Sequence, residues 1–196
     1  MNTSFQWMKD RSRILFLIPF LWSFFLILSA CGGGGGGGGA GSPVPTSITA
    51  DFLPTSTNVS SNLIAITKKT VQGDTITLDV SGVSLSTLSA GAAFDLTFDP
   101  NLVSYIGYLP GNFYESNSTV TYQSGLQVGT NNRLVVGITQ QAGPGTTGSG
   151  VLIQIKFKAI KIGSSNLTFA NNNLLSPSGP PLVPGLTWVT GALMGS

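Results

Sequence analysis

From residue 62 to the end of the chain, hydrophobic and polar residues alternate with a period of two. In "DTITLDVSGV", the apolar residues Ile76, Leu78 and Val80 alternate with threonine, aspartate and serine. The same alternation recurs in "NLIAITKK", "AAFDLTFD", "RLVVGIT", "GVLIQIKFKAI", "SNLTFA" and "LTWVTGAL". Successive side chains of a strand point to opposite faces, so this pattern predicts β-sheets with one buried face and no helix.

Turn-forming residues separate these runs. The separating stretches are "QGD", "DPN", "LPGN", "TNN", "GPGTTGSG", "IGSS" and "SPSGPP", and glycine, proline, asparagine and aspartate each favour turns. Many short strands at this spacing predict an all-β sandwich or jelly roll. A domain that covers residues 62–196 is long enough to bury a hydrophobic core without disulfides or metal.

The first thirty residues follow a different pattern. Lys9, Arg11 and Arg13 precede the apolar run "ILFLIPFLWSFFLIL", which ends in small residues. This order is typical of a secretory signal peptide, which we assign to residues 1–30. The alternative is a transmembrane helix. Residues 14–30 are close to the shortest span that crosses a bilayer, and Pro19 disfavours a continuous helix there.

The stretch "LSAC" at residues 28–31 resembles the lipobox of bacterial lipoproteins at all four positions. The resemblance implies cleavage before Cys31 and attachment of lipid to its sulfur, with two or more acyl chains giving a stable anchor. It places the protein in a bacterial cell envelope, and Gly32 after the cysteine favours the outer membrane if the host is Gram-negative. An uncleaved membrane helix and a free redox thiol are the alternatives.

Residues 31–61 have the composition of a spacer. Eight glycines run from Gly32 to Gly39, and a Ser/Thr/Pro-rich stretch follows. Glycine runs lose much backbone entropy on ordering and have no side chains to bury, so we expect a flexible tether. Ile48, Phe52 and Leu53 are expected to dock at most weakly on the domain.

Charge and composition exclude several functions. Only 8% of the residues are charged, and there is no histidine and one cysteine. The net charge of +2 arises before Cys31, so a nucleic-acid-binding surface is not expected. Without histidine or a second cysteine, the usual zinc sites and the His- or Cys-based catalytic triads are excluded. We predict no metal, no cofactor and no catalytic residue.

Three stretches in order resemble the cohesin family. They are "TKKTVQGDTITLDVSGVS", "GAAFDLTFDPNLVSYIGYLPGNF" and "RLVVGITQQAGPGTTGSGVLIQIKFKAIKIGSSNLTF". The resemblance covers roughly residues 63–193. It implies a nine-stranded jelly-roll sandwich and a non-enzymatic module that binds a dockerin-like protein, in the setting of polysaccharide breakdown. Calcium in such pairs belongs to the dockerin.

The resemblance also implies a binding face. It would lie on the sheet that contains "AAFDLTFD", together with strands near residues 119–124, 133–139 and 165–170. The outward positions expected to contact a partner are Asp95, Thr97, Thr121, Gln123, Val135, Gly137, Thr139, Asn166 and Thr168. The alternative is an ordinary solvated sheet face.

A second hypothesis is direct carbohydrate binding. Tyr108, Phe113 and Tyr114 crowd one strand and the loop after it, beside Tyr105, and an exposed aromatic platform would stack on sugars. The alternative, which we favour, is that Tyr105 lies in the core and the others pack over one end of the sandwich. Trp188 is expected in the core or at an edge. A purely structural envelope lipoprotein is the third hypothesis.

Two further motifs are interpreted as structural. "GPGTTGSG" at residues 143–150 matches a dinucleotide-binding pattern only formally, because that motif requires a following helix and a strand is predicted instead. Asp95 and Asp99 lie roughly 13 Å apart along one strand, which is too far for a typical glycosidase pair. Asp99 precedes Pro100 and is expected to organise a turn, so a hydrolase is the least favoured function.

Overall fold

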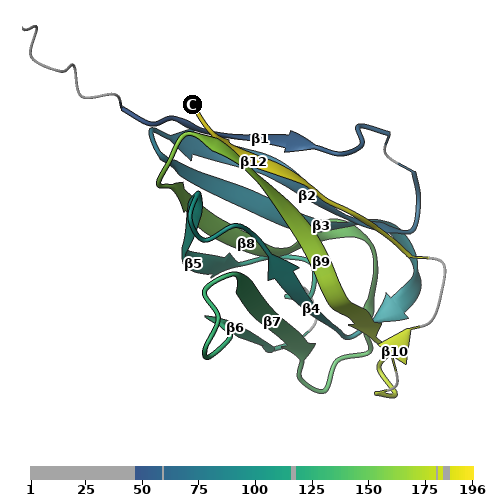
Figure 1. Ribbon diagram of the computed structural model, residues 1–196. Helices are drawn as coiled ribbons and strands as arrows, with labels where there is room; N and C mark the ends of the chain where they lie inside the picture. The colour runs from purple at the N-terminus through teal and green to yellow at the C-terminus, as the bar shows by residue number, and fades with distance from the viewer. Residues whose placement is uncertain (1–46, 59, 116–117, 180, 183–185) are drawn as a thin grey trace, which may run out of the picture. The chain divides into compact units, whose positions relative to one another are not determined.

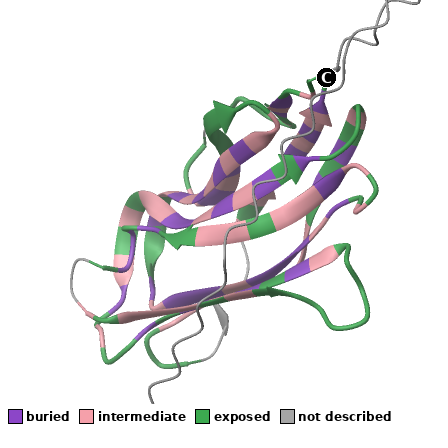
Figure 2. Ribbon diagram, turned by 90° about the vertical axis from the view of Figure 1, so that its left-hand side faces the viewer, coloured by how far each residue is buried: buried purple, intermediate pink, exposed green. Residues whose placement is uncertain are grey.

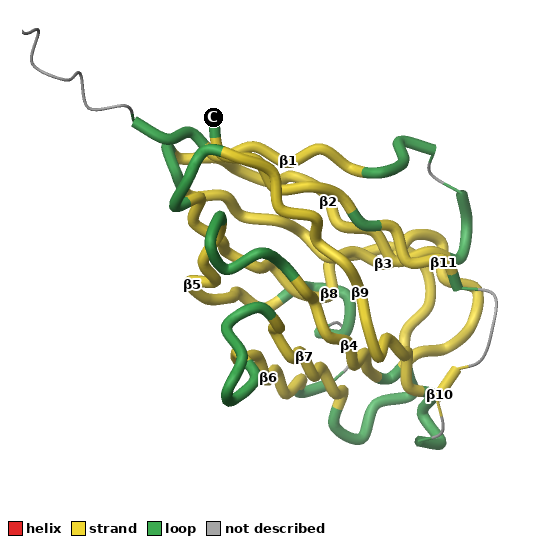
Figure 3. The backbone as a smooth tube through the Cα atoms, in the orientation of Figure 1, coloured by secondary structure: helices red, strands yellow, loops and turns green. Residues whose placement is uncertain are grey.

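A computed structural model describes residues 47–58, 60–115, 118–179, 181–182 and 186–196. These residues form twelve β-strands and no helix. In Figure 3 they appear as strands joined by loops. The strands are β1 (Ala50–Pro54), β2 (Leu63–Gln72), β3 (Thr75–Ser89), β4 (Gly91–Thr97), β5 (Val103–Pro110), β6 (Val120–Leu126), β7 (Arg133–Gln140), β8 (Thr146–Ala159), β9 (Gly163–Leu175), β10 (Pro181–Leu182), β11 (Thr187–Val189) and β12 (Gly191–Gly195).

The strands form two sheets that face each other (Figure 1). The larger sheet has the order β1-β12-β9-β4-β7-β6, and β10 pairs with β9. The smaller sheet has the order β11-β2-β3-β8-β5. Every pairing is antiparallel except that of β11 with β2. The predicted all-β sandwich is therefore confirmed.

The core lies between the sheets and follows the alternation of the sequence. In β3, Ile76, Leu78 and Val80 are buried while the residues between them are not, and Figure 2 shows the same alternation on other strands. From the larger sheet, Phe94 packs edge-on against Phe169, with ring centroids 5.2 Å apart. Fully burying side chains of this size stabilises the fold by about 1.5–3 kcal/mol each.

The C-terminal stretch "LTWVTGAL" forms two strands where one was expected. β11 joins the smaller sheet and β12 joins the larger one, so the chain changes sheets between Val189 and Gly191. At Gly191 a Cβ atom would collide with the ring of Phe52, which explains glycine at the crossing. Trp188 packs against Phe94 and Phe169 from the edge strand β11, as expected for a core or edge position.

The predicted spacer is wrong at its C-terminal end. β1 lies within residues 31–61, pairs with β12 along five residues, and buries Ala50 and Phe52 in the core. Its period-two pattern covers five residues, too few to stand out in a Ser/Thr/Pro-rich context. With β10 and the division of the last strand, β1 raises the strand number from the nine expected to twelve. The earlier part of the predicted spacer lies outside the described residues.

Candidate functional site

The outer surface of the larger sheet carries the residues predicted to bind a partner. Pairing of β4 with β7 and β9 places Asp95 beside Val135 and Thr97 beside Thr168. Pairing of β6 with β7 places Thr121 opposite Thr139 and Gln123 opposite Gly137. Asn166 lies farther along, opposite Ala192 of β12. On β4, β7 and β9 these positions alternate with buried core residues, and on β6 they alternate with the partly buried Val120, Tyr122 and Ser124, so their side chains share the outer face.

Most of this face is accessible and uncharged. Gln123, Val135, Thr139, Asn166 and Thr168 are exposed. Thr97 and Thr121 are half-buried, and the Oγ1 of Thr97 donates to the Thr168 carbonyl. Val135 is the largest apolar side chain among the predicted positions and is 45% exposed. A Cβ atom at Gly137 would meet only Gln123, at 4.0 Å, so the surface is open there.

Asp95 does not present its carboxylate to solvent. The residue is 5% exposed, and the Oδ2 atom accepts hydrogen bonds from the Nε and Nη2 atoms of Arg133. The Nδ2 atom of Asn171 donates to the same oxygen at 2.7 Å. The charge of Asp95 is thus neutralised within the chain, and the expectation that Asp95 contacts a partner directly stays a prediction.

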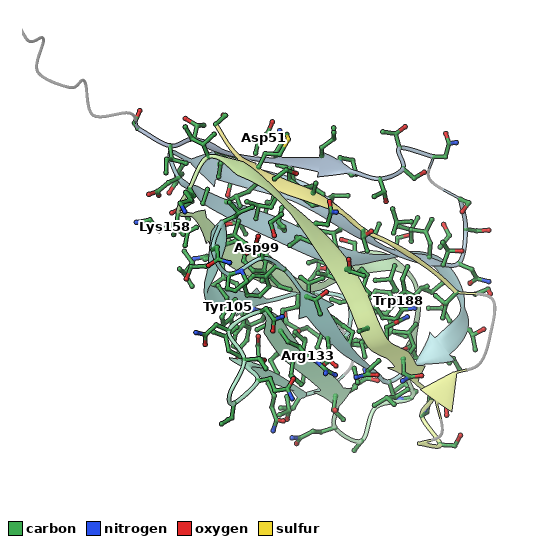
Figure 4. The ribbon with its side chains drawn as sticks, viewed as in Figure 1. Asp51, Asp99, Tyr105, Arg133, Lys158 and Trp188 are labelled. Carbon is green, nitrogen blue, oxygen red and sulfur yellow. The ribbon has the colours of Figure 1, made fainter. Side chains whose placement is uncertain are left out.

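Arg133 and Asn171 are the site residues that sequence reasoning missed. Arg133, which Figure 4 labels, is the first residue of β7 and lies opposite Thr97. It is therefore a diagonal neighbour of Asp95 on the same face of the sheet. The contact between Arg133 and Asp95 could have been predicted only with knowledge of the register between β4 and β7. Asn171 sits at an irregularity between β9 and β4, with a left-handed φ of 48°. No period-two pattern reveals such a residue, although asparagine tolerates this conformation better than most.

The scan against family models matches the cohesin domain over residues 61–179. The chain belongs to the cohesin family. A search of curated proteins finds no significant match.

Solved structures share the fold of this cohesin. One is a type II cohesin domain from the cellulosome of Acetivibrio cellulolyticus, with a TM-score of 0.59 and 13% identity, covering 69% of this chain and 95% of that one. A second is the second type II cohesin module of the ScaA adaptor scaffoldin from the same organism, with a TM-score of 0.59, 12% identity and coverage of 69% and 91%. A third is an N-terminal interface mutant of a type II cohesin–X–dockerin complex, also from Acetivibrio cellulolyticus. Its TM-score is 0.52 at 12% identity, with coverage of 64% and 93%.

The aromatic residues proposed for sugar stacking are packed inside this cohesin domain. Phe113 and Tyr114 are buried and pack edge-on, with centroids 4.9 Å apart. The hydroxyls of Tyr114 and Ser89 are hydrogen-bonded at 2.7 Å, and burial raises the pKa of Tyr114. Tyr108 is half-buried, and its hydroxyl donates to the Tyr122 carbonyl. Two of the three residues therefore cannot form an exposed platform, which corrects the carbohydrate hypothesis at these positions.

Tyr105 and Tyr122 complete this packing between the edge strands β5 and β6. The hydroxyl of Tyr105 (Figure 4) is hydrogen-bonded to the Oγ of Ser124 at 2.9 Å, and its ring packs against Phe157 in the core. The hydroxyl of Tyr122 donates to the Gly111 carbonyl, and burial raises the pKa of Tyr122 to about 12. The tyrosines thus connect the two sheets along one side of the sandwich.

The two motifs interpreted as structural have structural roles. The Oδ1 atom of Asp99 accepts hydrogen bonds from the backbone and side-chain nitrogens of Asn101, which organises the turn before β5. After Gly145 the chain enters strand β8, so no helix follows the glycine motif. Among the described residues, no group of three or more histidine, cysteine, aspartate or glutamate side chains is arranged to hold a metal ion.

Within the part of the chain that the structure describes, no helix has the length and hydropathy to cross a membrane. Cys31 and the apolar segment before it lie outside the described residues. The lipid anchor therefore stays a prediction.

Proposed function

We propose that this cohesin is a non-enzymatic module that binds a dockerin-like protein through the outer face of β9, β4, β7 and β6. The observation that carries the proposal is the character of this face: four paired strands present exposed threonine, glutamine, asparagine and valine side chains. Membership in the cohesin family supports it, as does the fold shared with a cohesin solved in complex with a dockerin.

The electrostatics of the face suit such a partner. Burying a charge in an interface is costly unless it is paired and hydrogen-bonded. Here the charged groups, Asp95 and Arg133, already satisfy each other. A partner can therefore cover the face without removing an unpaired ion from water. We expect Val135 to be the apolar centre of the contact, with hydrogen bonds from the threonines around it.

A binding assay with matched variants tests the face. Purified dockerin-bearing proteins would be titrated calorimetrically against the wild type and against Thr168→Arg, which places a long charged side chain on β9. The control is Thr67→Arg, the same change at an exposed position of β2 in the smaller sheet. We expect Thr168→Arg to weaken binding at least ten-fold and Thr67→Arg to leave it unchanged. Equal affinities for both variants would exclude this face, and no binding by any dockerin would overturn the proposed partner.

We further propose that Cys31 carries lipid and holds the domain at a bacterial envelope, where the bound partner would act on polysaccharide. The support is the "LSAC" motif after a basic and apolar leader. Cells expressing the protein would be labelled with a radioactive fatty acid, with Cys31→Ser as the comparison. We expect label only in the wild type. Equal labelling of the two proteins would show that the cysteine is not the lipid attachment site.

A further inference from the structure

The outer face of the smaller sheet carries a polar groove that the cohesin–dockerin proposal does not use. Its volume is about 270 Å³, close to the lower limit for small-molecule sites. It crosses four strands and is lined by Lys69, Thr70, Gln72, Thr75, Thr77, Leu109, Gln154 and Lys156. We propose that this groove binds an anionic sugar residue, such as a uronate unit of an acidic polysaccharide.

The positive charge of the groove comes from its two lysines. Lys156 forms no ion pair with any described residue. The Nζ atom of Lys69 lies 3.9 Å from Asp79 Oδ1, which is beyond hydrogen-bonding distance. By contrast, Lys158 (Figure 4), on the same strand as Lys156, lies 3.2 Å from Asp74 and is already paired. Lys69 and Lys156 can therefore donate to a carboxylate on a ligand.

Two irregularities in the flanking strands shape the groove. The register of β2 with β3 shifts between Lys68 and Thr70, so Lys69 is an extra residue placed next to the groove. The register of β5 with β8 shifts between Tyr105 and Gly107. Gly107, opposite Lys156, has a φ of 146° and open space where a Cβ would stand. Bulges commonly redirect side chains at functional sites, and here one positions a lysine and the other leaves Lys156 uncovered.

The remaining lining favours a sugar over a simple anion. Three threonine hydroxyls and two glutamine amides supply both donors and acceptors, which hydroxyl groups of a sugar require. Leu109 is 42% exposed and offers an apolar wall for the carbon–hydrogen face of a ring. No aromatic residue lines the groove, so stacking is absent and the charge must supply selectivity. We therefore expect binding to be weak and to weaken further as salt is added.

Calorimetry on the purified full chain in a non-ionic detergent tests the site. The probes are a trisaccharide of galacturonate, a neutral glucose trisaccharide and inorganic phosphate. We expect the uronate to bind in the range of about 0.1–1 mM, set by few contacts, and the other two probes to bind at least ten-fold more weakly. If phosphate binds as tightly as the uronate, the groove is a general anion site. If the neutral sugar binds as tightly as the uronate, charge does not determine binding. Either result overturns the proposal, as does absence of uronate binding.

Matched variants locate the site. Lys156→Gln and Lys69→Gln should each weaken uronate binding at least five-fold, whereas Lys161→Gln removes the same charge outside the groove and should change nothing. Thr168→Arg on the opposite sheet should also leave uronate binding unchanged, which separates this site from the proposed dockerin face. Equal losses for Lys156→Gln and Lys161→Gln would mean that net charge, and not the groove, attracts the sugar. Thermal unfolding of each variant confirms that it is folded.

Discussion

Two aspartates occupy equivalent places on the two sheets and have opposite surroundings. Asp95 on β4 and Asp79 on β3 each lie in a central strand and point away from the core. Asp95 Oδ2 accepts hydrogen bonds from Arg133 and Asn171. Asp79 Oδ1 is buried without any hydrogen-bond partner among the described residues. The same alternation therefore produces a hydrogen-bonded carboxylate on one face and, on the other, a carboxylate with one oxygen that lacks a hydrogen-bond partner among the described residues.

This difference shows what each face is able to do. On the larger sheet the charges neutralise each other and leave a surface of neutral side chains, which a protein can cover at low desolvation cost. On the smaller sheet the charges are only partly matched, and Lys156 is left to act on a ligand. If the contrast is correct, removing a charged side chain from the larger sheet should lower the free energy of unfolding. Removing one from the smaller sheet should leave that free energy unchanged or raise it.

Replacement of Asp95 by alanine should have the largest effect. It would leave the Arg133 guanidinium, which is 33% exposed, without its partner. Breaking a fully buried pair costs about 3–5 kcal/mol, so we expect the free energy of unfolding to fall by about 2–3 kcal/mol at this partly exposed site. Urea unfolding measures it.

The double variant Asp95→Ala with Arg133→Met supplies the control for that loss. Removing both partners leaves no unpaired charge, so the double variant should be more stable than Asp95→Ala alone. The alternative result is that the free energy of unfolding falls in the double variant by the sum of the losses in the two single variants. In that case, the ion pair does not explain the stability of this face.

Asn171 should contribute a smaller, separable amount. Asn171→Gly keeps the left-handed backbone and removes the hydrogen bond to Asp95, which should cost about 1 kcal/mol. Asn171→Ala also places an ordinary side chain at a φ of 48°, which should cost about 1 kcal/mol more. Equal stability of the two variants in urea would show that backbone conformation is unimportant here.

The sandwich could be predicted from the sequence because its evidence is local and repeated. The spacing of Ile76, Leu78 and Val80 alone indicates a buried face, and three strands of the candidate face, β4, β7 and β9, include the runs that the alternation predicted. The fourth strand, β6, was expected only from the resemblance to cohesins. Strand β1 was missed because only five residues carry its pattern. The aromatic residues after β5 show the same limit, because spacing does not tell whether Phe113 packs inward from a loop.

The burial and ion pairing of Asp95 on the candidate face could not be predicted, because they depend on contacts between segments that are distant in the sequence. Asp95 was correctly placed on the outer face, but its burial arises from Arg133, 38 residues later, and Asn171, 76 residues later. The groove likewise depends on bulges in β2 and β5, and a bulge is defined by how two strands pair. Both features require the register between strands, which single-strand periodicity does not supply.

Asp79→Asn should stabilise the protein at neutral pH. Burial raises the pKa of Asp79, and the nearby Lys69 only partly opposes this. The folded protein therefore binds the proton of Asp79 more tightly than the unfolded chain does. This proton binding stabilises the fold at low pH, and the stabilisation is lost as the pH rises through the pKa of Asp79 in the folded protein. An amide stays neutral, and we expect a gain of about 0.5 kcal/mol at pH 7, limited by solvent and by Lys69.

The pH dependence distinguishes this explanation from a general packing effect. Urea unfolding of the wild type and Asp79→Asn would be compared at pH 7 and near pH 3. The advantage of the variant should disappear at the lower pH, where Asp79 is protonated in both states. An advantage that persists at pH 3 would mean that the charge of Asp79 is not the cause.

Lys156→Gln should have the smallest effect on stability. The ammonium group has no ion-pair partner among the described residues, and its neighbours across the strands are Thr77 and Gly107. Surface substitutions at residues that form no ion pair usually change the free energy of unfolding by less than about 0.5 kcal/mol. Urea unfolding at low and high salt should therefore give the wild-type midpoint in both conditions. A loss above about 1 kcal/mol would mean that Lys156 supports the sheet, as Arg133 does on the other face. The contrast between a self-neutralised face and an open, cationic groove would then no longer hold.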